Sequence, residues 1–350
     1  MTQDSLDFMA RLGLSVPIIQ APMAGFQASA LAIAAGEAGA LGSLPGASLA
    51  PQALRDEVKA MRARGARAVN VNFFSHTPPE ADPAREQAWR AALKPYYDEF
   101  GVDAASIPAG PGRLPFGDEA AALVEEVRPE VVSFHFGLPR EDLLERVRRT
   151  GAQIWSSATT VEEARWLEAR GVDAVIAQGL EAGGHRGMFL SDDVTTQLGT
   201  LALVPQVVAA IRCPVIAAGG IADAAGVSAA LRLGAVAVQA GTAFLRSPEA
   251  TTSALHREAL ASEAARHTAL TNLFSGRPAR GIVNRLMREL GPLSDLPPAF
   301  PTAVNALAPL RAAAEKRGSG DFSPLWSGQN AQGALDIPAA DIVRALAAGL

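Results

Sequence analysis

The chain has 350 residues, of which 49% are hydrophobic and 19% are charged, and its formal net charge is −5. This composition is typical of a soluble globular protein, and the acidic balance argues against a nucleic-acid partner, because nucleic-acid-binding surfaces carry a basic stripe. Cys213 is the only cysteine, which excludes an internal disulfide and a cysteine-based metal site, and we expect no bound metal.

The N-terminal stretch, residues 1–14, contains acidic residues and lacks the apolar core of a signal peptide. No run of about 18 apolar residues occurs in the chain, so we expect no membrane span. Together with the single cysteine, these features predict a cytoplasmic protein.

Short apolar runs and helix-like stretches alternate along the chain. Most of the apolar runs are continuous, as expected for parallel strands that are buried on both faces. The predicted strands cover residues 16–23, 40–45, 67–74, 131–137, 152–158, 173–179, 213–220 and 235–244. The predicted helices, rich in Ala, Leu, Glu and Arg, cover residues 29–39, 50–64, 140–150, 161–170, 197–211, 223–233 and 249–264.

This alternation predicts an α/β protein built on a (β/α)8 TIM barrel, a fold that typically takes about 250 residues. A doubly wound sheet is the structural alternative, but it favours a glycine fingerprint after its first strand, and G-x-G-x-x-G does not occur here. The surplus residues form an insertion at about 78–129 and a tail. We expect a barrel over residues 1–262 that includes the insertion, and a segment over 263–350 that packs on the barrel mouth and caps the active site.

The active site of such a barrel lies at the carboxyl ends of its strands. Most of the predicted strands end in polar residues or glycines, more than chance would place there. These residues are Gln20, Pro22, Met23, Asn70, Asn72, His135, Gln178, Gly219, Gly220, Gln239, Ala240, Gly241 and Thr242. The pattern indicates a ligand site.

Glycines follow the last two strands, in "AAGGIAD" (217–223) and "VQAGTAF" (238–244). Glycine lets backbone N–H groups approach an anion, and the start of a helix adds a favourable dipole. Phosphate sites in this fold often lie after the seventh and eighth strands. One such turn alone is often only a tight connection, but the pair predicts a site for a phosphorylated cofactor.

The amides of Asn70, Asn72 and Gln178 both donate and accept hydrogen bonds, which suits the mixed edge of a flavin ring better than a metal. Either Asn could equally be satisfied by backbone groups. Met23 either packs the barrel mouth or lies against a ring face.

Two histidines lie at or just beyond predicted strand ends. His135 ends "VVSFHFG", where a lone histidine is as often structural as functional. His185 follows the thin stretch "EAGG", which we interpret as room for a cofactor ring and a substrate, so His185 is the candidate general acid or base. His76 lacks such a setting, and we expect His256 and His267 on the surface.

Seven motifs occur in a fixed order between about residues 13 and 333: "PIIQAPMAG", "VNVNFFSH", "VSFHFG", "AQGLEAGGHRG", "PVIAAGGIAD", "VQAGTAFL" and "SGRPARGIVNR". In order and spacing the chain resembles the nitronate monooxygenase family, formerly called 2-nitropropane dioxygenase. The motifs "EAGGHRG", "SGRPARG" and "LWSGQ" (325–329) resemble the class I bacterial branch in particular.

The resemblance implies a TIM barrel that binds FMN without a covalent link. It implies oxidation of alkyl nitronates, notably propionate 3-nitronate, by O2 through a flavosemiquinone to a carbonyl compound and nitrite. By motif, His185 matches the catalytic histidine of the family and His135 a second histidine that faces the substrate. The residues implied to hold FMN are Gln20, Ala21, Pro22, Met23, Asn70, Asn72, Gln178, Gly183, Gly184, Gly219, Gly220, Gln239, Ala240, Gly241 and Thr242. The expected partners are therefore a nitronate and O2, for a monomer or a homodimer.

Two questions stay open at this point. The only tyrosines, Tyr96 and Tyr97, lie in the insertion, so any role that relatives give to a tail tyrosine must fall to another residue; Lys316 and Arg277 are the candidates for binding a substrate carboxylate. The alternative function is an FMN-dependent NAD(P)H:quinone reductase or enoyl-thioester reductase on the same scaffold. A sensor barrel without turnover is a third hypothesis, which the two histidines at strand ends disfavour.

Overall fold

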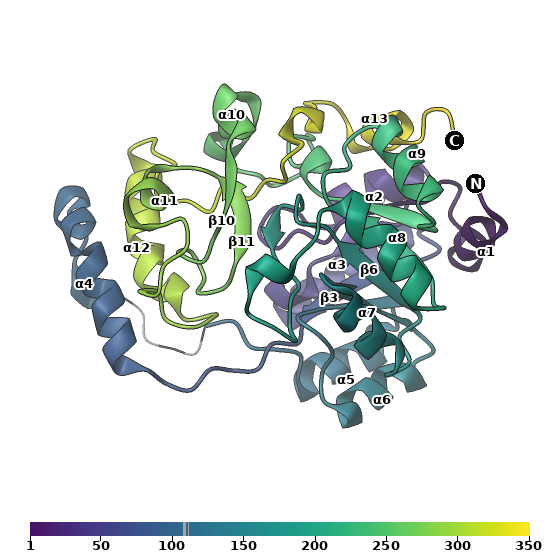
Figure 1. The fold of residues 1–350 in the computed structure, drawn as a ribbon, viewed down its shortest axis with the longest axis horizontal. Helices are drawn as coiled ribbons and strands as arrows, with labels where there is room; N and C mark the ends of the chain where they lie inside the picture. Colours follow the sequence, from purple (N-terminus) through teal and green to yellow (C-terminus); the bar gives the residue numbers. More distant parts are fainter. Residues whose placement is uncertain (108–109, 111) are drawn as a thin grey trace.

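In the part of the chain that the structure describes, residues 1–107, 110 and 112–350, eight parallel strands form a central barrel (Figure 1). They are β1 (Ile18–Gln20), β2 (Ser43–Leu44), β3 (Asn70–Phe74), β4 (Val131–His135), β5 (Gln153–Ala158), β6 (Ala174–Gln178), β8 (Val215–Ala218) and β9 (Ala237–Ala240). In this computed structural model they pair in the order β1-β9-β8-β6-β5-β4-β3-β2, and a parallel bridge between Ile19 and Leu41 joins the two outer strands. The predicted TIM barrel is confirmed.

Helices surround the barrel on its outside. They are α2 (Ser29–Glu37), α3 (Pro51–Ala63), α5 (Asp118–Val127), α6 (Glu141–Arg149), α7 (Val161–Glu168), α8 (Thr200–Ala210) and α9 (Ala224–Arg232). The remaining place in the ring, between α9 and α2, is taken by α13 (Ala339–Leu346). Its residues 339, 342, 343 and 346 are buried in the apolar core that the barrel strands form with the surrounding helices. This spacing puts one apolar stripe of α13 against the barrel. The helix after β9, α10 (Ala254–Ala261), lies aside from this ring, next to η5 (Glu263–Arg266).

The amino ends of the strands are closed by α1 (Gln3–Leu12), which the sequence patterns did not predict. Phe8 and Leu12 of this helix belong to the same apolar cluster as the barrel interior, and the ring of Phe8 stacks on Trp155 of β5 with 5.5 Å between centroids. The barrel is therefore packed at this end, and its opposite end, where the strands finish, is left for a site.

The insertion and the tail fold together into a lobe beside the barrel (Figure 1). Its helices are α4 (Pro83–Phe100), α11 (Arg285–Leu290) and α12 (Ala303–Lys316). α4 packs on α12, where the indole of Trp89 donates to the carbonyl of Ala303 at 3.3 Å and the hydroxyl of Tyr97 to that of Ala306 at 2.7 Å. Tyr96 and Tyr97 are buried here. Both tyrosines thus join the two segments of the lobe.

A small antiparallel sheet connects this lobe to the barrel. It consists of β7 (Gly184–His185), β11 (Ala279–Ile282) and β10 (Thr268–Thr271), in the order β10-β11-β7. β7 comes from the connection between β6 and α8, whereas the other two strands come from the tail. The predicted strand end "EAGGHRG" is therefore also the edge of a second sheet.

The contacts of α5 and α13 bear on where the barrel and the lobe begin and end. α5 packs against α3 and α6 in the ring, so the inserted part of 78–129 ends before Asp118; residues 108, 109 and 111 of that stretch lie outside the described residues. We propose that the barrel comprises residues 1–77, 118–262 and 334–350. The remaining segments then form the lobe, and only the part of 263–350 that precedes α13 lies over the barrel mouth.

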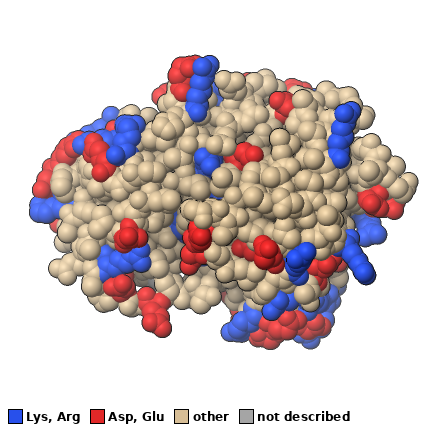
Figure 2. Space-filling model, in the orientation of Figure 1, with Lys and Arg blue, Asp and Glu red and all other residues tan. Residues whose placement is uncertain are grey.

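Charged side chains of both signs are mixed on the face shown in Figure 2. They gather over α5 and α6, where Arg146 forms ion pairs with Asp118 at 3.1 Å and with Glu125 at 2.8 Å. Neither sign forms a large patch on this face. Among the helices of the described residues, none combines the length and the apolar character needed to cross a bilayer.

Candidate active site

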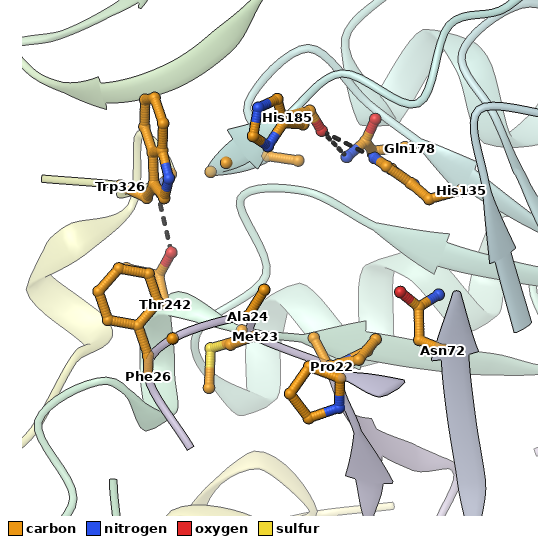
Figure 3. Close-up of a pocket in the computed structure, with 18 of the residues that line it drawn as sticks. Pro22, Met23, Ala24, Phe26, Asn72, His135, Gln178, His185, Thr242 and Trp326 are labelled. Atoms are coloured by element: carbon orange, nitrogen blue, oxygen red, sulfur yellow. Dashed lines mark hydrogen bonds between the residues drawn. The ribbon is translucent and has the colours of Figure 1, made fainter. Parts of the chain in front are cut away.

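A cavity of about 680 Å³ opens between the carboxyl ends of the barrel strands and the lobe. Its volume lies in the range of cofactor and small-molecule sites. Because successive side chains of a strand point to opposite faces, inward-facing residues near the carboxyl ends of the strands form its floor, as Asn72, His135 and Gln178 do. The lobe supplies the opposite wall through Phe300 and Trp326. Figure 3 shows His185 and Trp326 on one side and Pro22, Met23 and Asn72 on the other.

Most of the residues expected to hold a cofactor line this cavity. They are Ala21, Pro22, Met23, Asn72, Gln178, Gly183, Gly184, Gly219, Gly220, Gln239, Ala240, Gly241 and Thr242, and both candidate catalytic histidines, His135 and His185, line it with them. The cavity thus brings together residues from nearly every strand end.

Gln20 and Asn70 are not among the residues that line the cavity. Both side chains are fully buried. The amide of Gln20 donates to Gln27 Oε1 at 2.7 Å and accepts from the backbone N–H of Ser43 at 3.1 Å, and Asn70 Nδ2 donates to Ser43 Oγ at 2.9 Å. Asn70 lies two residues before Asn72 on the same face of β3, hence one layer deeper in the barrel. These two amides cross-link strand ends beneath the site.

The amide of Gln178 holds the loop that carries His185. Its Nε2 donates to the carbonyl of His185 at 2.9 Å, and its Oε1 accepts from the backbone N–H of Gly187 at 2.7 Å. His135 Nε2 lies 3.1 Å from the same His185 carbonyl, and its Nδ1 lies 2.9 Å from Ser157 Oγ. Figure 3 shows both side chains pointing at this carbonyl. The amide expected at a ligand edge is therefore occupied by the protein itself.

The imidazole of His185 is held by the tail. On β7, His185 pairs with Ala279 of β11, and its Nε2 lies 2.8 Å from the hydroxyl of Ser275. Aromatic rings enclose it, with centroids 5.4 to 6.3 Å from its own: Phe74, Phe136, Phe300 and Trp326. A side chain that is fixed on so many sides presents one orientation to the cavity.

Both site histidines are neutral near pH 7. Burial lowers the pKa of His185 well below its ordinary value, and the positive charges of Arg113 and Arg277 lower it further. Burial also lowers the pKa of His135 to about 4, although its hydrogen bond to the His185 carbonyl acts in the opposite direction. The two imidazoles therefore act as hydrogen-bonding groups rather than as fixed positive charges, until an anion binds beside them and favours the protonated form.

The thin backbone around His185 is required by the packing of the protein itself. A Cβ on Gly183 would lie 2.5 Å from the backbone nitrogen of Gly328, and a Cβ on Gly187 would lie 2.9 Å from the ring of His135. Both distances are shorter than a real contact allows. Gly184, with φ of +72°, faces open space. The interpretation of "EAGG" as room for a ligand thus applies to Gly184, whereas Gly183 and Gly187 accommodate neighbouring segments.

Arg186, next to His185, is a buried clamp for the same loop. Its side chain is fully buried and donates to the carbonyls of Gly179 at 2.8 Å and Gln178 at 2.7 Å and to Gln197 Oε1 at 2.6 Å. Burial lowers its pKa to about 9. Its role is to fix the turn that follows β6.

The far end of the cavity has the features of an anion cradle. Gly219 and Gly220 have φ of +119° and +70°, and Gly241 directly precedes η4 (Thr242–Phe244). A Cβ on Gly219 would lie 2.8 Å from Thr200 Oγ1, so only glycine fits there. Beside them, Gln239 Oε1 is buried and accepts no hydrogen bond from the described residues. A buried acceptor without a donor is costly, and a ligand hydroxyl or N–H would satisfy it. This end fits the phosphorylated cofactor expected from the sequence.

One expectation about a side chain outside the strand ends needs correction. His256 was expected on the surface but is buried, with its Nε2 3.0 Å from the carbonyl of Trp326. His76 is buried beside the ring of Phe300, at 4.8 Å between centroids. His267 is exposed, as expected. The error about His256 arose because its partner lies 70 residues away.

Neither candidate for a substrate carboxylate lines the cavity. Lys316 is exposed on the last turn of α12. The guanidinium of Arg277 lies over the ring of Phe136 at 4.3 Å and donates to the carbonyl of Met188. The cavity is instead lined by Arg113 and Arg311, which the sequence patterns did not single out.

The sequence patterns also missed Ser275, Phe300 and Trp326. Ser275 and Trp326 lie inside the quoted motifs "SGRPARG" and "LWSGQ", but nothing local in those motifs shows which side chain faces a cavity. Their contacts with His185 join residues 90 or more positions apart, which no periodicity reveals.

Comparison with known proteins agrees with this geometry. A family model described as nitronate monooxygenase matches residues 7–349. A nitronate monooxygenase of Pseudomonas aeruginosa is 44% identical over 348 residues, covering 97% of this chain and 97% of that protein, and one of Paraburkholderia phytofirmans is 43% identical, covering 96% and 92%. The solved structure of a nitroalkane oxidase from Streptomyces ansochromogenes superposes with a TM-score of 0.88 at 38% identity, covering 98% of this chain and 97% of that one.

Proposed function

The chain belongs to the nitronate monooxygenase family, so it is an oxidoreductase, and we propose that it oxidises alkyl nitronates with O2 to a carbonyl compound and nitrite, with FMN as its cofactor. Propionate 3-nitronate is the proposed substrate. We propose that the enzyme works in the cytoplasm as a monomer or homodimer, without a metal.

The observation that carries this proposal is the division of one cavity into two ends. The glycine cradle of Gly219, Gly220 and Gly241, with the unpaired Oε1 of Gln239, would hold the phosphate and ribityl chain of FMN. Pro22, Met23 and Asn72 would lie along the flavin, across the cavity from His185. When bound, FMN would supply the electron transfer between the substrate and O2.

The second end suits a nitronate. A nitronate is already an anion, so no proton has to be removed from its carbon. A neutral imidazole of His185, oriented by Ser275, can donate a hydrogen bond to a nitronate oxygen, and His135 supports the loop from the other side. The rings of Phe74, Phe300 and Trp326 would exclude water from the bound substrate, which strengthens such hydrogen bonds.

Oxygen uptake by the as-purified yellow protein, on addition of propionate 3-nitronate, tests this proposal. We expect rapid uptake with matching formation of nitrite. His185→Asn should keep FMN, measured by visible absorbance, and lose turnover on the order of 100-fold, because it removes the imidazole that would bind and orient the nitronate. His267 is exposed, and His267→Gln is the matched control, which should leave turnover unchanged.

If the protein is instead the alternative reductase, the opposite results are expected in these assays. A protein that carries FMN, takes up no oxygen with nitronates and is bleached rapidly by NADH without air would be an NAD(P)H-dependent reductase. Normal turnover in His185→Asn would contradict the role proposed for this residue, even if nitronates are oxidised.

A further inference from the structure

The cavity has an uneven charge distribution that the proposed reaction does not by itself require. The residues that line it include two arginines and two histidines, Arg113, Arg311, His135 and His185, and in the described part of the chain no lining residue is an aspartate or glutamate. A wall with cations and no carboxylate favours an anionic ligand.

Of the two arginines, only Arg113 is not neutralised by a carboxylate. Arg311 Nε forms an ion pair with Glu315 Oε1 at 2.7 Å. Within the described residues, no carboxylate lies within 4.0 Å of the Arg113 guanidinium. Its contact is with the ring of Phe74, 5.3 Å from the centroid. A half-buried guanidinium that lacks a counter-ion is costly, and a bound anion would offset that cost.

The position of Arg113 separates it from the expected phosphate cradle. The ring of Phe74, under its guanidinium, is also in contact with the imidazole of His185, at 6.3 Å between centroids. Arg113 and His185 thus both lie near the same aromatic ring. The glycines of the cradle follow β8 and β9, whereas Phe74 ends β3. Arg113 is therefore placed for a substrate group rather than for the cofactor phosphate.

The backbone that carries Arg113 is fixed to the barrel. Its carbonyl oxygen lies 3.1 Å from His76 Nε2, and the N–H of Phe116, three residues on, donates to the carbonyl of Phe74 at 2.7 Å. A Cβ on the preceding Gly112 would touch Pro301 of the lobe at 3.0 Å. An anchored arginine offers a planar pair of donors, the geometry that matches a carboxylate.

From this geometry we infer that Arg113 binds the carboxylate of the substrate and makes the enzyme selective for short nitronates that end in a carboxylate. The inference rests on the proposed function and assigns the residue that sets its substrate class. With the nitronate at His185, a two-carbon chain along the face of Phe74 brings the carboxylate toward the guanidinium. Both tyrosines are buried in the lobe, where Tyr96 donates to Glu289 of α11 and Tyr97 to the carbonyl of Ala306 of α12, and neither lines the cavity.

The test compares two substrates of equal length. Propionate 3-nitronate carries the carboxylate, and propyl-1-nitronate has a methyl group in its place. Arg113→Gln should lower kcat/KM for propionate 3-nitronate by about 10- to 100-fold, mostly through KM, because a charge-assisted hydrogen bond is lost. It should leave propyl-1-nitronate nearly unchanged. Arg113→Lys, which keeps the charge but not the planar fork, should recover part of the loss. Lys316→Gln, which removes an exposed charge outside the cavity, is the control.

Three outcomes would overturn the inference. They are an equal loss for both substrates in Arg113→Gln, no loss for either, and a selective loss in Arg311→Gln instead. If the wild-type protein oxidises neither nitronate, the proposed function fails. Calorimetry then measures the binding of 3-nitropropionate and still tests whether Arg113 binds a carboxylate. Binding that disappears in Arg113→Gln supports a carboxylate site, and binding that persists contradicts it.

Discussion

The imidazole of His185 and the hydroxyl of Ser275 lie 2.8 Å apart, although 90 residues separate them in the chain. His185 stands on the edge strand that follows β6, and Ser275 stands in the tail, in the turn between β10 and β11. The backbone N–H of Arg277 also donates to Ser275 Oγ at 3.4 Å, so the hydroxyl oxygen is itself held in place. The proposed catalytic histidine is therefore positioned by the lobe rather than by the barrel alone.

Ser275 should act as a positioning residue. Ser275→Ala is expected to lower kcat by about 2- to 10-fold with little change in KM, because one hydrogen bond to the imidazole is lost. Ser275→Thr keeps the hydroxyl and should retain most of the activity. Steady-state kinetics with propionate 3-nitronate, at equal FMN content, measure this. A change in KM alone would place Ser275 in substrate binding instead.

The clamp formed by Arg186 should be essential for stability. Arg186→Met leaves two buried acceptors, on Gln178 and Gln197, without the donor they have now, while the carbonyl of Gly179 keeps the N–H of Ala182. The free energy of unfolding should fall by at least about 2 kcal/mol, since each unsatisfied acceptor costs about 1–3 kcal/mol. Urea denaturation checks this value. Lys59→Met, at an exposed site on α3, is the control and should leave stability nearly unchanged. A small effect in Arg186→Met would mean that water replaces the guanidinium.

Replacing glycine by alanine should lower the stability of the protein at Gly183 and raise it at Gly36. Gly183→Ala would push the Cβ against the backbone of Ser327 and Gly328 and cost about 1–3 kcal/mol of stability. It should also weaken the hydrogen bond from the Gly328 N–H to Thr242 Oγ1 at the expected cofactor site. Gly36 lies within α2 with open space around it, so Gly36→Ala should stabilise the protein by about 0.5–1 kcal/mol. Thermal unfolding and FMN retention measure both variants, and equal effects would refute the steric argument.

Buried histidines should make the protein lose stability in mild acid. Burial lowers the pKa of His256 to about 4 from 6.5, so the unfolded chain binds a proton between these values and the folded protein does not. The stability that His256 contributes is fully present above pH 6.5 and is lost as the pH falls toward 4. His76 and His135, whose pKa values burial also lowers to about 4, act in the same direction.

The contribution of His256 can be isolated by His256→Gln, which retains a donor for the Trp326 carbonyl. Between about pH 7.5 and about pH 5, the variant should lose less stability than the wild type, by about 2 kcal/mol. Urea unfolding at both pH values measures the difference. His267→Gln, at an exposed site, should show the wild-type dependence. If His256→Gln behaves as the control does, His256 remains neutral in the unfolded chain or becomes accessible in the folded one.

The sequence by itself determined the barrel and the position of its site. Continuous apolar runs and the glycines that end the helices are local signals, and the carboxyl ends of parallel strands meet at one end of a barrel whatever else the chain does. For this reason His135, His185, Asn72 and the glycines after β8 and β9 could be predicted to lie together, and they line one cavity.

Only the tertiary structure decided what these residues contact. Gln20 ends β1 and Asn70 begins β3, and the layer in which each side chain lies places both beneath the site. α13 closes the ring of helices, Ser275 orients His185, and His256 is buried by Trp326, each through contacts between distant parts of the chain. Periodicity reports which face of an element is apolar, but it does not report which distant segment covers that face. The sequence predicted a capping segment, but the packing of the insertion and the tail into one lobe, with Arg113 at its junction with the barrel, could therefore not be predicted from the sequence alone.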